Sequence, residues 1–283
     1  MTSPSHPNQS IQAEVLDEGG PPEGHPRREA ASQPPPPQGE GWGEGGHPIP
    51  RLRATGLRVL RGGKVILRDV DVAAHEGEVL GILGPSGAGK STLFRALVGE
   101  RLPDAGTVHL GAEDVTDWPL WKRARQGIGY IPQSPSVLWD LTVRENLVTF
   151  HRVVHGTDGR PEERAREVGL AERLDVRAGE LSAGERRRLE FARAITGEPR
   201  VLVCDEPFSG IDPVGATRLG ELLRDLASRG TAVLLADHHV EEALRVCSRA
   251  ILLLDGSVAV SAAPGEFEKH PLVQGRYLGT WRP

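Results

Sequence analysis

The stretch Gly84-Pro85-Ser86-Gly87-Ala88-Gly89-Lys90-Ser91 decides the fold of this chain, because it matches the G-x-x-x-x-G-K-[ST] phosphate-loop pattern. That pattern needs a buried strand before it and a helix after it. The apolar run 79–83 supplies the strand, and residues 91–97 follow as a predicted helix. A glycine-rich turn without this context would carry little weight. The sequence therefore predicts a phosphate site built on a parallel sheet.

The composition of the loop explains how it would hold phosphates. Glycines let successive backbone N–H groups turn toward the phosphate oxygens, and the helix dipole adds positive potential at the same point. Lys90 would reach the β- and γ-phosphates, and the Ser91 hydroxyl would ligate Mg²⁺. The predicted nucleotide-binding set is Gly84, Pro85, Ser86, Gly87, Ala88, Gly89, Lys90, Ser91 and Thr92.

Two acidic residues end a second apolar strand, predicted over residues 200–204. Asp205 and Glu206 are adjacent, so their side chains point in different directions and can divide the work. Asp205 would hold Mg²⁺ through water, and Glu206 would polarise the attacking water as general base. An acidic pair at a strand end is more often a solvated loop. The four apolar residues before it and the upstream phosphate loop favour catalysis.

Farther from the loop, strands and helices alternate along the chain. Strands are predicted at 232–236 and 250–254, with helices at 216–228 and 240–246, which indicates a parallel sheet covered on both faces. Short β-rich runs precede the phosphate loop. The polar, arginine-rich region that starts near residue 140 predicts an inserted helical subdomain over about 140–195.

The first fifty residues differ from the rest in composition. They contain 11 prolines and 8 glycines, with seven acidic and two basic side chains, so they account for the net charge of −5 of the whole chain. We predict a disordered acidic tail over 1–50, with a short polyproline II piece at Pro34–Pro37, and a folded domain over 51–283. The domain is neutral overall, which argues against non-specific nucleic-acid binding.

Membrane and redox signals are weak in this sequence. No apolar run approaches the roughly 18 to 20 residues that span a bilayer, and the N-terminus lacks the order of a secretion signal. Cys204 and Cys247 lie in apolar contexts without metal-ligand spacing, which favours buried thiols in a reducing compartment. We expect a cytoplasmic protein that contacts a membrane only through partners.

The residues Leu181-Ser182-Ala183-Gly184-Glu185 look like the signature motif of the ATP-binding cassette family, with Ala183 at the usual second glycine. The resemblance covers nearly everything from Leu52 to about Gly279. It implies an α/β P-loop NTPase fold with an antiparallel β subdomain and an inserted helical subdomain. It also implies that Ser182 and Gly184 contact the γ-phosphate held by a second copy of the chain. A Ser-x-Gly that opens a helix is by itself a plausible anion site.

Three more positions resemble family motifs in the expected order. Gln133 matches the Q-loop glutamine that senses Mg²⁺ and the attacking water, and Asp212 matches the D-loop at the dimer interface. His238 matches the switch histidine that contacts the γ-phosphate, with the adjacent His239 as the alternative. Without the resemblance, these would be a polar loop residue, a turn and a structural histidine. Leu60 stands where the family has an adenine-stacking aromatic residue, which predicts weak base selectivity.

The resemblance implies a working cycle. Two copies would close around ATP, hydrolysis by Glu206 and His238 would reopen them, and the cycle would drive integral membrane permease subunits docked beside Gln133. Leu138 and Trp139 are candidates for the docking groove, with packing between subdomains as an equal alternative. The chain would then lie on the cytoplasmic face of the inner membrane.

Several stretches resemble the lipopolysaccharide-export ATPases and the related branched-chain amino-acid importer ATPases. They are Gly184–Arg188, Glu206–Pro213, Asp237–His238 and Arg276–Gly279. Phe208 and Asp237 favour export over import.

A non-transport cassette acting in DNA repair or on ribosomes would need a second phosphate loop or a coiled coil, and a dead cassette would lack the catalytic residues. The run Arg186–Arg188 predicts a solvated helix face.

Overall fold

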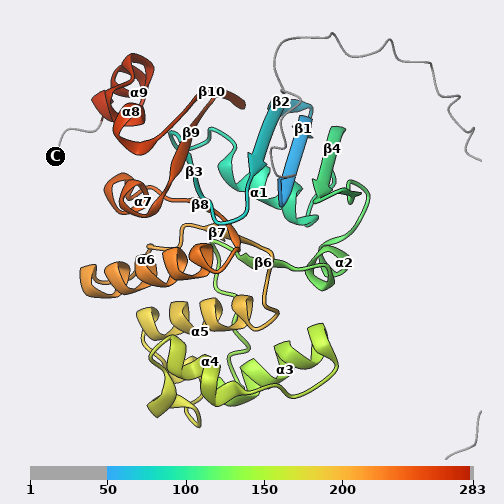
Figure 1. Cartoon of the computed structure of the whole chain (residues 1–283), viewed down its shortest axis with the longest axis vertical. Coiled ribbons are helices and arrows are strands. Elements are labelled where there is room, and N and C mark those ends of the chain that lie inside the picture. The colour runs from blue at the N-terminus through green and yellow to red at the C-terminus, as the bar shows by residue number, and fades with distance from the viewer. Residues whose placement is uncertain (1–49, 281–283) are drawn as a thin grey trace, which may run out of the picture. The chain divides into compact units, whose positions relative to one another are not determined.

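A computed structural model describes residues 50–280 of the chain (Figure 1). The tail expected over residues 1–50, including the polyproline piece, lies outside the described residues apart from Pro50. Two sheets and a set of helices make up the described part. This arrangement confirms the predicted α/β class, with an antiparallel sheet beside a mainly parallel one.

The first sheet contains only antiparallel pairs, in the order β2-β1-β4-β5. Its strands are β1 (Leu52–Arg61), β2 (Lys64–Ala74), β4 (Ala105–Leu110) and β5 (Glu113–Asp114). The second sheet has the order β10-β9-β3-β8-β7-β6, parallel except for the pair β9–β10. Its strands are β3 (Val79–Leu83), β6 (Ile128–Ile131), β7 (Val201–Asp205), β8 (Ala232–Ala236), β9 (Arg249–Leu254) and β10 (Ser257–Ala262).

Helices fill the connections between the strands. The α-helices are α1 (Lys90–Val98), α2 (Leu120–Arg125), α3 (Val143–His155), α4 (Pro161–Glu167), α5 (Ala183–Ile195), α6 (Pro213–Ser228), α7 (Val240–Val246), α8 (Pro264–Lys269) and α9 (Pro271–Arg276). Short 3₁₀ turns occur at η1 (Ala171–Arg173), η2 (Ala178–Glu180) and η3 (Leu278–Thr280). Figure 1 shows α3, α4 and α5 grouped on the far side of the parallel sheet from β1, β2 and β4. They form the helical insertion between β6 and β7.

The parallel strands are buried on both faces. Every residue of β3, β7 and β8 is buried, as the unbroken apolar runs of these strands require. Alternate side chains of β3 enter two different cores. Leu80 and Ile82 pack with α1 and the antiparallel sheet, whereas Val79 and Leu83 pack with α5 and α6. The phosphate loop therefore begins at a strand that is fixed from both sides.

The sequence did not predict β6. Ile128–Ile131 is only four residues long and extends the sheet beside β7, pairing Ile131 with Cys204. A four-residue apolar run followed by proline looks like a loop when it is taken alone. Because β6 ends at Ile131, it fixes the start of the segment that carries Gln133.

Gly84 is the glycine of the loop for which we expect substitution to cost most. Its φ is 153°, and a Cβ built on it would lie 2.2 Å from the Leu253 carbonyl oxygen. Gly87 has a φ of 80°, but its Cβ would meet nothing within 4 Å. We expect Gly84→Ala to lower the stability by about 2 kcal/mol or more, and Tm by about 5 °C. Gly87→Ala should cost less, and thermal unfolding followed by circular dichroism tests the difference. Equal losses for the two variants would contradict this account.

Candidate functional site

The phosphate loop connects β3 to α1 and presents its backbone outward. Pro85, Ser86 and Gly87 are exposed, while Ala88 is buried and donates its backbone N–H to the Pro85 carbonyl at 3.2 Å. Gly89 precedes α1 in a left-handed conformation and provides no side-chain cap. The first amides of the helix are thus available to an anion, which is the geometry that the motif predicts.

Lys90 lies back over its own loop. Its Nζ donates to the Gly84 carbonyl at 2.6 Å and to the Pro85 carbonyl at 3.1 Å. Burial lowers the pKa of Lys90, and the nearby carboxylates of Glu206, Asp205 and Asp237 oppose that shift. The ammonium group therefore faces both the loop and the acidic strand ends.

Asp205 and Ser91 lie together beside the loop. The Ser91 side chain hydrogen-bonds to the Asp205 carboxylate, whose pKa is raised by burial and lowered in part by this bond. A buried carboxylate next to a hydroxyl gives the hard oxygen donors that suit Mg²⁺. Two of the three predicted metal-site residues, Ser91 and Asp205, are thus brought together, although they come from different elements.

Glu206 follows β7 with an unusual backbone. Its φ is 54°, and its N–H donates to the Ala236 carbonyl of β8 at 2.7 Å. A glutamate rarely adopts the left-handed region, so this conformation is held by its surroundings. It turns the Glu206 side chain toward His238, whose Nδ1 lies 3.6 Å from Glu206 Oε2. The two residues meet because they follow adjacent parallel strands.

Asp237 organises both histidines, a role that the sequence did not reveal. Its carboxylate is buried and accepts backbone N–H bonds from Phe208 and His239, each at 2.9 Å. His239 Nδ1 lies 2.9 Å and His238 Nδ1 3.5 Å from Asp237 Oδ1. From the sequence, Asp237 had served only as a subfamily marker. The available signal was an acidic residue directly after a buried strand.

The prediction of a solvated helix face over Arg186–Arg188 is wrong for Arg187. Its side chain is buried on α5 and is ion-paired with Glu190 at 2.8 Å. Its guanidinium donates to four backbone carbonyls, those of Pro132, Asp205, Glu206 and Pro207. A buried guanidinium can satisfy its five donors only with such a set of acceptors. Arg187 thereby joins the segment before Gln133 to the end of β7.

The network extends from Glu190 toward the Gln133 segment. Glu190 Oε1 accepts the Ser136 backbone N–H at 2.6 Å, and Arg193 donates to the Ser136 carbonyl. Gln133 itself is exposed and follows the Pro132 carbonyl that Arg187 binds. The charged residues of α5 thus fix the chain on both sides of Gln133.

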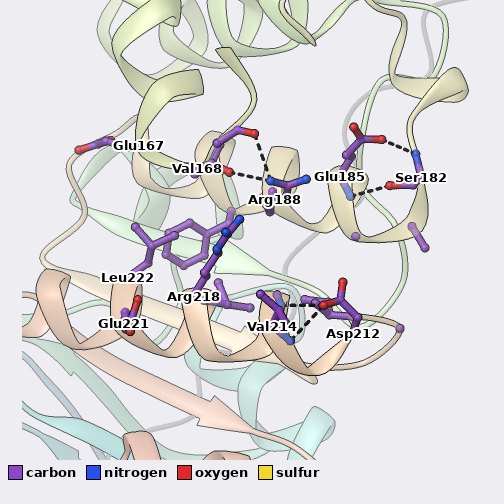
Figure 2. A pocket seen from close by; sticks show the side chains of 18 of the residues that line it. Glu167, Val168, Ser182, Glu185, Arg188, Asp212, Val214, Arg218, Glu221 and Leu222 are labelled. Atoms are coloured by element: carbon purple, nitrogen blue, oxygen red, sulfur yellow. Dashed lines mark hydrogen bonds between the residues drawn. The ribbon is translucent and has the colours of Figure 1, made fainter. Parts of the chain in front are cut away.

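The signature residues line a separate cleft of about 900 Å³ between α5 and α6. Ser182 caps α5 in a capping box, in which its Oγ accepts the Glu185 N–H and Glu185 accepts the Ser182 N–H. Figure 2 shows this pair on one wall and Asp212 on the other. Gly184 also lines the cleft, whereas the phosphate loop does not.

Asp212 has a clear local role. Its Oδ1 accepts the backbone N–H groups of Val214 and Gly215 at 3.0 Å each, which caps α6 (Figure 2). These bonds, that to Gly215 first, hold its pKa below the ordinary value. The structure therefore brings the predicted site residues together in two separate groups. One group contains Lys90, Ser91, Asp205, Glu206 and His238. The other group contains Ser182, Gly184 and Asp212.

The C-terminal segment also reaches the phosphate loop. Tyr277 follows α9, and its hydroxyl accepts the backbone N–H of Gly84. Burial raises the pKa of Tyr277, and the bond to Gly84 lowers it in part. Resemblance alone drew attention to the Arg276–Gly279 stretch, and this contact gives it a physical function at the loop.

Leu138 and Trp139 lie on the surface between β6 and α3. Their exposed fractions are 38% and 47%, so both side chains are only partly covered by the rest of the chain. Arg186 lies over the Trp139 ring at 5.3 Å.

No helix within residues 50–280 is both long and apolar enough to cross a bilayer. Both cysteines of the chain are buried, which raises the pKa of each to about 12.

Comparison with known proteins places these features in context. The family model described as ABC transporter matches residues 67–209. The chain is 42% identical over 220 residues to the lipopolysaccharide export system ATP-binding protein LptB of Acidithiobacillus ferridurans, covering 76% of this chain and 91% of the relative. It is 36% identical to the protein of the same name from Escherichia coli (strain K12), covering 81% of this chain and 97% of the relative.

Solved structures agree on the fold. The ADP conformation of an ATP-binding cassette of an ABC transporter matches with a TM-score of 0.74 at 25% identity, covering 82% of this chain and 99% of that chain. A dimeric post-hydrolysis state of an ATP-binding cassette, bound to ADP and Pi, matches with a TM-score of 0.68 at 25% identity. That match covers 75% of this chain and 98% of the other.

Proposed function

Because this chain belongs to the ABC transporter family as an ATP-binding subunit, we propose that it hydrolyses ATP to drive export of a lipopolysaccharide-type cargo. Members of this family are ATP hydrolases. The observation that carries the proposal is the approach of Glu206 to His238 beside the phosphate loop, with Asp205 bonded to Ser91. This arrangement supplies a base, a phosphate contact and a cation site in one place.

The chemistry follows from the positions of the side chains. The phosphate-loop amides and Lys90 bind the β- and γ-phosphates, and Glu206 accepts a proton from the attacking water as that water approaches the γ-phosphorus. His238 contacts the γ-phosphate and, at 3.6 Å from Glu206, is in place to orient the base. Catalysis here is mainly positioning and charge stabilisation.

Mg²⁺ is the cofactor that these oxygen donors fit. Ser91 would ligate it directly, Asp205 would hold it through water, and Gln133 would approach it from the segment after β6. When bound with ATP, the ion neutralises charge on the β- and γ-phosphates. Asp205 is kept beside Ser91 by burial and a hydrogen bond, so it orients the water molecules around the ion. It does not itself take a proton from water.

A second copy of the chain completes the site in this proposal. Ser182 and Gly184 line a cleft that the phosphate loop does not share, so one copy does not bring both groups to the same phosphate. The dimeric cassette among the structural matches supports an arrangement in which each copy supplies the signature residues to the other. ATP then holds two copies together, and hydrolysis releases them.

Integral membrane permease subunits are the proposed partners. A mainly apolar groove of about 380 Å³ lies near the Gln133 segment, lined by residues that include Tyr130, Pro132 and Phe150. Leu138 and Trp139 add exposed apolar surface on the same segment. A partner helix bound in this groove would contact the chain beside the Pro132 carbonyl. Arg187 donates to that carbonyl and to the Glu206 carbonyl, so it links the groove to the catalytic base. Docking of this kind would place the chain on the cytoplasmic face of the inner membrane.

Purification of the intact complex tests the transport assignment. Membranes of the organism that makes the chain are solubilised in mild detergent, the chain is captured by a C-terminal tag, and partners are identified by mass spectrometry. Recovery of paired six-helix export subunits would support lipopolysaccharide-type export. Importer permeases with a binding protein would indicate branched-chain amino-acid uptake instead. Recovery of only soluble or nucleic-acid-associated partners would contradict a transport function but not ATP hydrolysis.

We expect weak discrimination between ATP and GTP. Leu60 is half-buried near the end of β1, and its backbone N–H is bound by Asp104 at 2.7 Å, so it offers no aromatic face to a base. Loss of base stacking removes on the order of 1–3 kcal/mol of binding that an aromatic residue would provide. Competition of GTP against labelled ATP measures the ratio of dissociation constants. A many-fold preference for ATP would refute this expectation, and Leu60→Tyr should tighten the binding of both nucleotides.

A further inference from the structure

The residues around Asp237 form a cluster of nitrogen and oxygen donors that ATP hydrolysis alone does not explain. Ligand atoms of Asp237, His238 and His239 all lie within 4.8 Å of one another. The two imidazole rings are 4.0 Å apart between centroids, at an interplanar angle of 42°. Glu206 is the neighbouring carboxylate, with its Oε2 3.6 Å from His238 Nδ1, and a shift of its side chain would bring it in as a fourth donor. We propose that these four residues form a Zn²⁺ site whose occupation inhibits the ATPase.

The spacing of the donors supports a tetrahedral ion. Zn²⁺ binds histidine nitrogen and carboxylate oxygen at about 2.0–2.2 Å, so adjacent donors of a tetrahedron lie about 3.3 Å apart. Asp237 Oδ1 lies 2.9 Å from His239 Nδ1 and 3.5 Å from His238 Nδ1. His238 Nδ1 and Glu206 Oε2 are 3.6 Å apart. These three separations lie within a few tenths of an ångström of that value, and Glu206 would complete the tetrahedron by a movement of its side chain.

The cluster combines a rigid anchor with open access. Asp237 is fully buried, and its Oδ2 is held by the Phe208 N–H, so its carboxylate cannot turn away from the histidines. The His238 and His239 side chains are 56% and 41% exposed, which lets an ion enter from solvent. A hydrogen bond that holds a ligand in place from outside the coordination sphere is a usual property of metal sites in proteins.

The donor set distinguishes this site from the proposed Mg²⁺ position. Two imidazoles and two carboxylates suit Zn²⁺, whereas Mg²⁺ prefers oxygen donors and several waters. In the ion-free cluster, the carboxylate oxygens can only accept, so the Nδ1 atoms carry the protons that face Asp237. An ion bound at Nδ1 takes the place of those protons, and each neutral ring then carries its proton on Nε2. The binding is a ligand exchange that needs no redox partner.

Inhibition follows from what the ion would occupy. A Zn²⁺ ion coordinated by Glu206 uses the lone pair that would accept the proton of the attacking water. The same ion fixes His238 away from the γ-phosphate. This part of the inference rests on the proposed function of Glu206 and His238, whereas binding of the ion does not.

Binding is measured on the full chain without nucleotide. We expect calorimetric titration with ZnCl₂ to give one ion per chain, and Co²⁺ to show the visible absorption of a tetrahedral complex. His239→Asn removes one ligand, while its amide can still donate to Asp237, and we expect it to weaken Zn²⁺ binding at least about tenfold. His155→Asn is the matched control, because His155 belongs to another close histidine pair, with His151 at 4.6 Å. Absence of binding, or equal affinity in wild type and His239→Asn, would overturn the proposal.

Hydrolysis is then measured with excess Mg-ATP while Zn²⁺ is varied. We expect wild type and His155→Asn to be inhibited alike, and His239→Asn, measured against its own Zn²⁺-free rate, to need at least about tenfold more Zn²⁺ for the same fractional inhibition. Equal inhibition of all three would mean that Zn²⁺ acts at the nucleotide instead, and the site would be wrong. If the wild-type chain shows no hydrolysis without Zn²⁺, the proposed function fails, and the calorimetry still decides the site.

Discussion

Glu206→Gln is expected to lower the rate of ATP hydrolysis by about 10²- to 10⁴-fold while ATP remains bound, because a general base contributes rate enhancement in that range. The amide has the shape of the carboxylate but cannot take a proton from water. The backbone of Glu206 is held by Ala236 and Arg187, so the substitution should leave the local structure in place. ATP would then accumulate between two copies of the chain.

Two measurements check this result. Phosphate release gives the loss in rate, and size-exclusion chromatography with Mg-ATP should show a dimer for Glu206→Gln and mainly single copies for the wild type. Glu198→Gln is a matched control, since Glu198 also has a left-handed backbone, with φ 47°, but is exposed and pairs with Arg164. Hydrolysis near the wild-type rate in Glu206→Gln would show that another residue is the base.

Arg187→Met is expected to lower the free energy of unfolding by about 3–5 kcal/mol, the usual cost of removing one partner of a buried ion pair. Glu190 would keep its charge in the core with only the Ser136 N–H as a partner among the bonds described above. The carbonyls of Asp205 and Glu206 would lose the donor that they share. Chemical denaturation measures the loss.

A double variant separates the two causes. Arg187→Met with Glu190→Met removes both charges, and we expect it to be more stable than Arg187→Met alone, because no unpaired carboxylate remains. Arg188→Met is the control on the same helix, and it should cost less than about 1 kcal/mol because Arg188 is only half-buried. A loss below 1 kcal/mol in Arg187→Met would mean that the network adds little. Below the melting range, Arg187→Met should also reduce kcat, since Glu206 loses its backbone support.

The sequence predicted the parts of the site that have fixed spacing. The phosphate loop could be found because the strand, the glycines, the lysine and the hydroxyl follow each other within a short stretch of sequence. Asp205 and Glu206 could be found because they end an unbroken apolar run. The role of His238 was expected only from the resemblance to the family, and the structure brings it near Glu206 because the two residues follow neighbouring parallel strands.

The composition of the sequence does not show which charged residues are buried. Three consecutive arginines do not show which one faces the core, and a solvated face is the common outcome for such a run. The helical period held a signal, because residues 187, 190, 191 and 194 form one stripe of α5 that contains Phe191 and Ala194. A buried arginine and glutamate on an otherwise apolar stripe indicate a paired interior charge. The contacts of Asp237 and Tyr277 depend on elements far apart in sequence, which no local pattern records.

The two buried thiols make the chain suitable for chemical labelling at chosen positions. Thiolate is the reactive form, and a thiol with a pKa of about 12 inside the core reacts slowly with maleimides near neutral pH. Cys204 and Cys247 are the only cysteines in the sequence, so neither has to be replaced. One cysteine introduced on an exposed position, such as Val214 at the mouth of the cleft, would carry a fluorophore alone. Fluorescence transfer between two labelled copies could then report each closing and opening of the pair in real time.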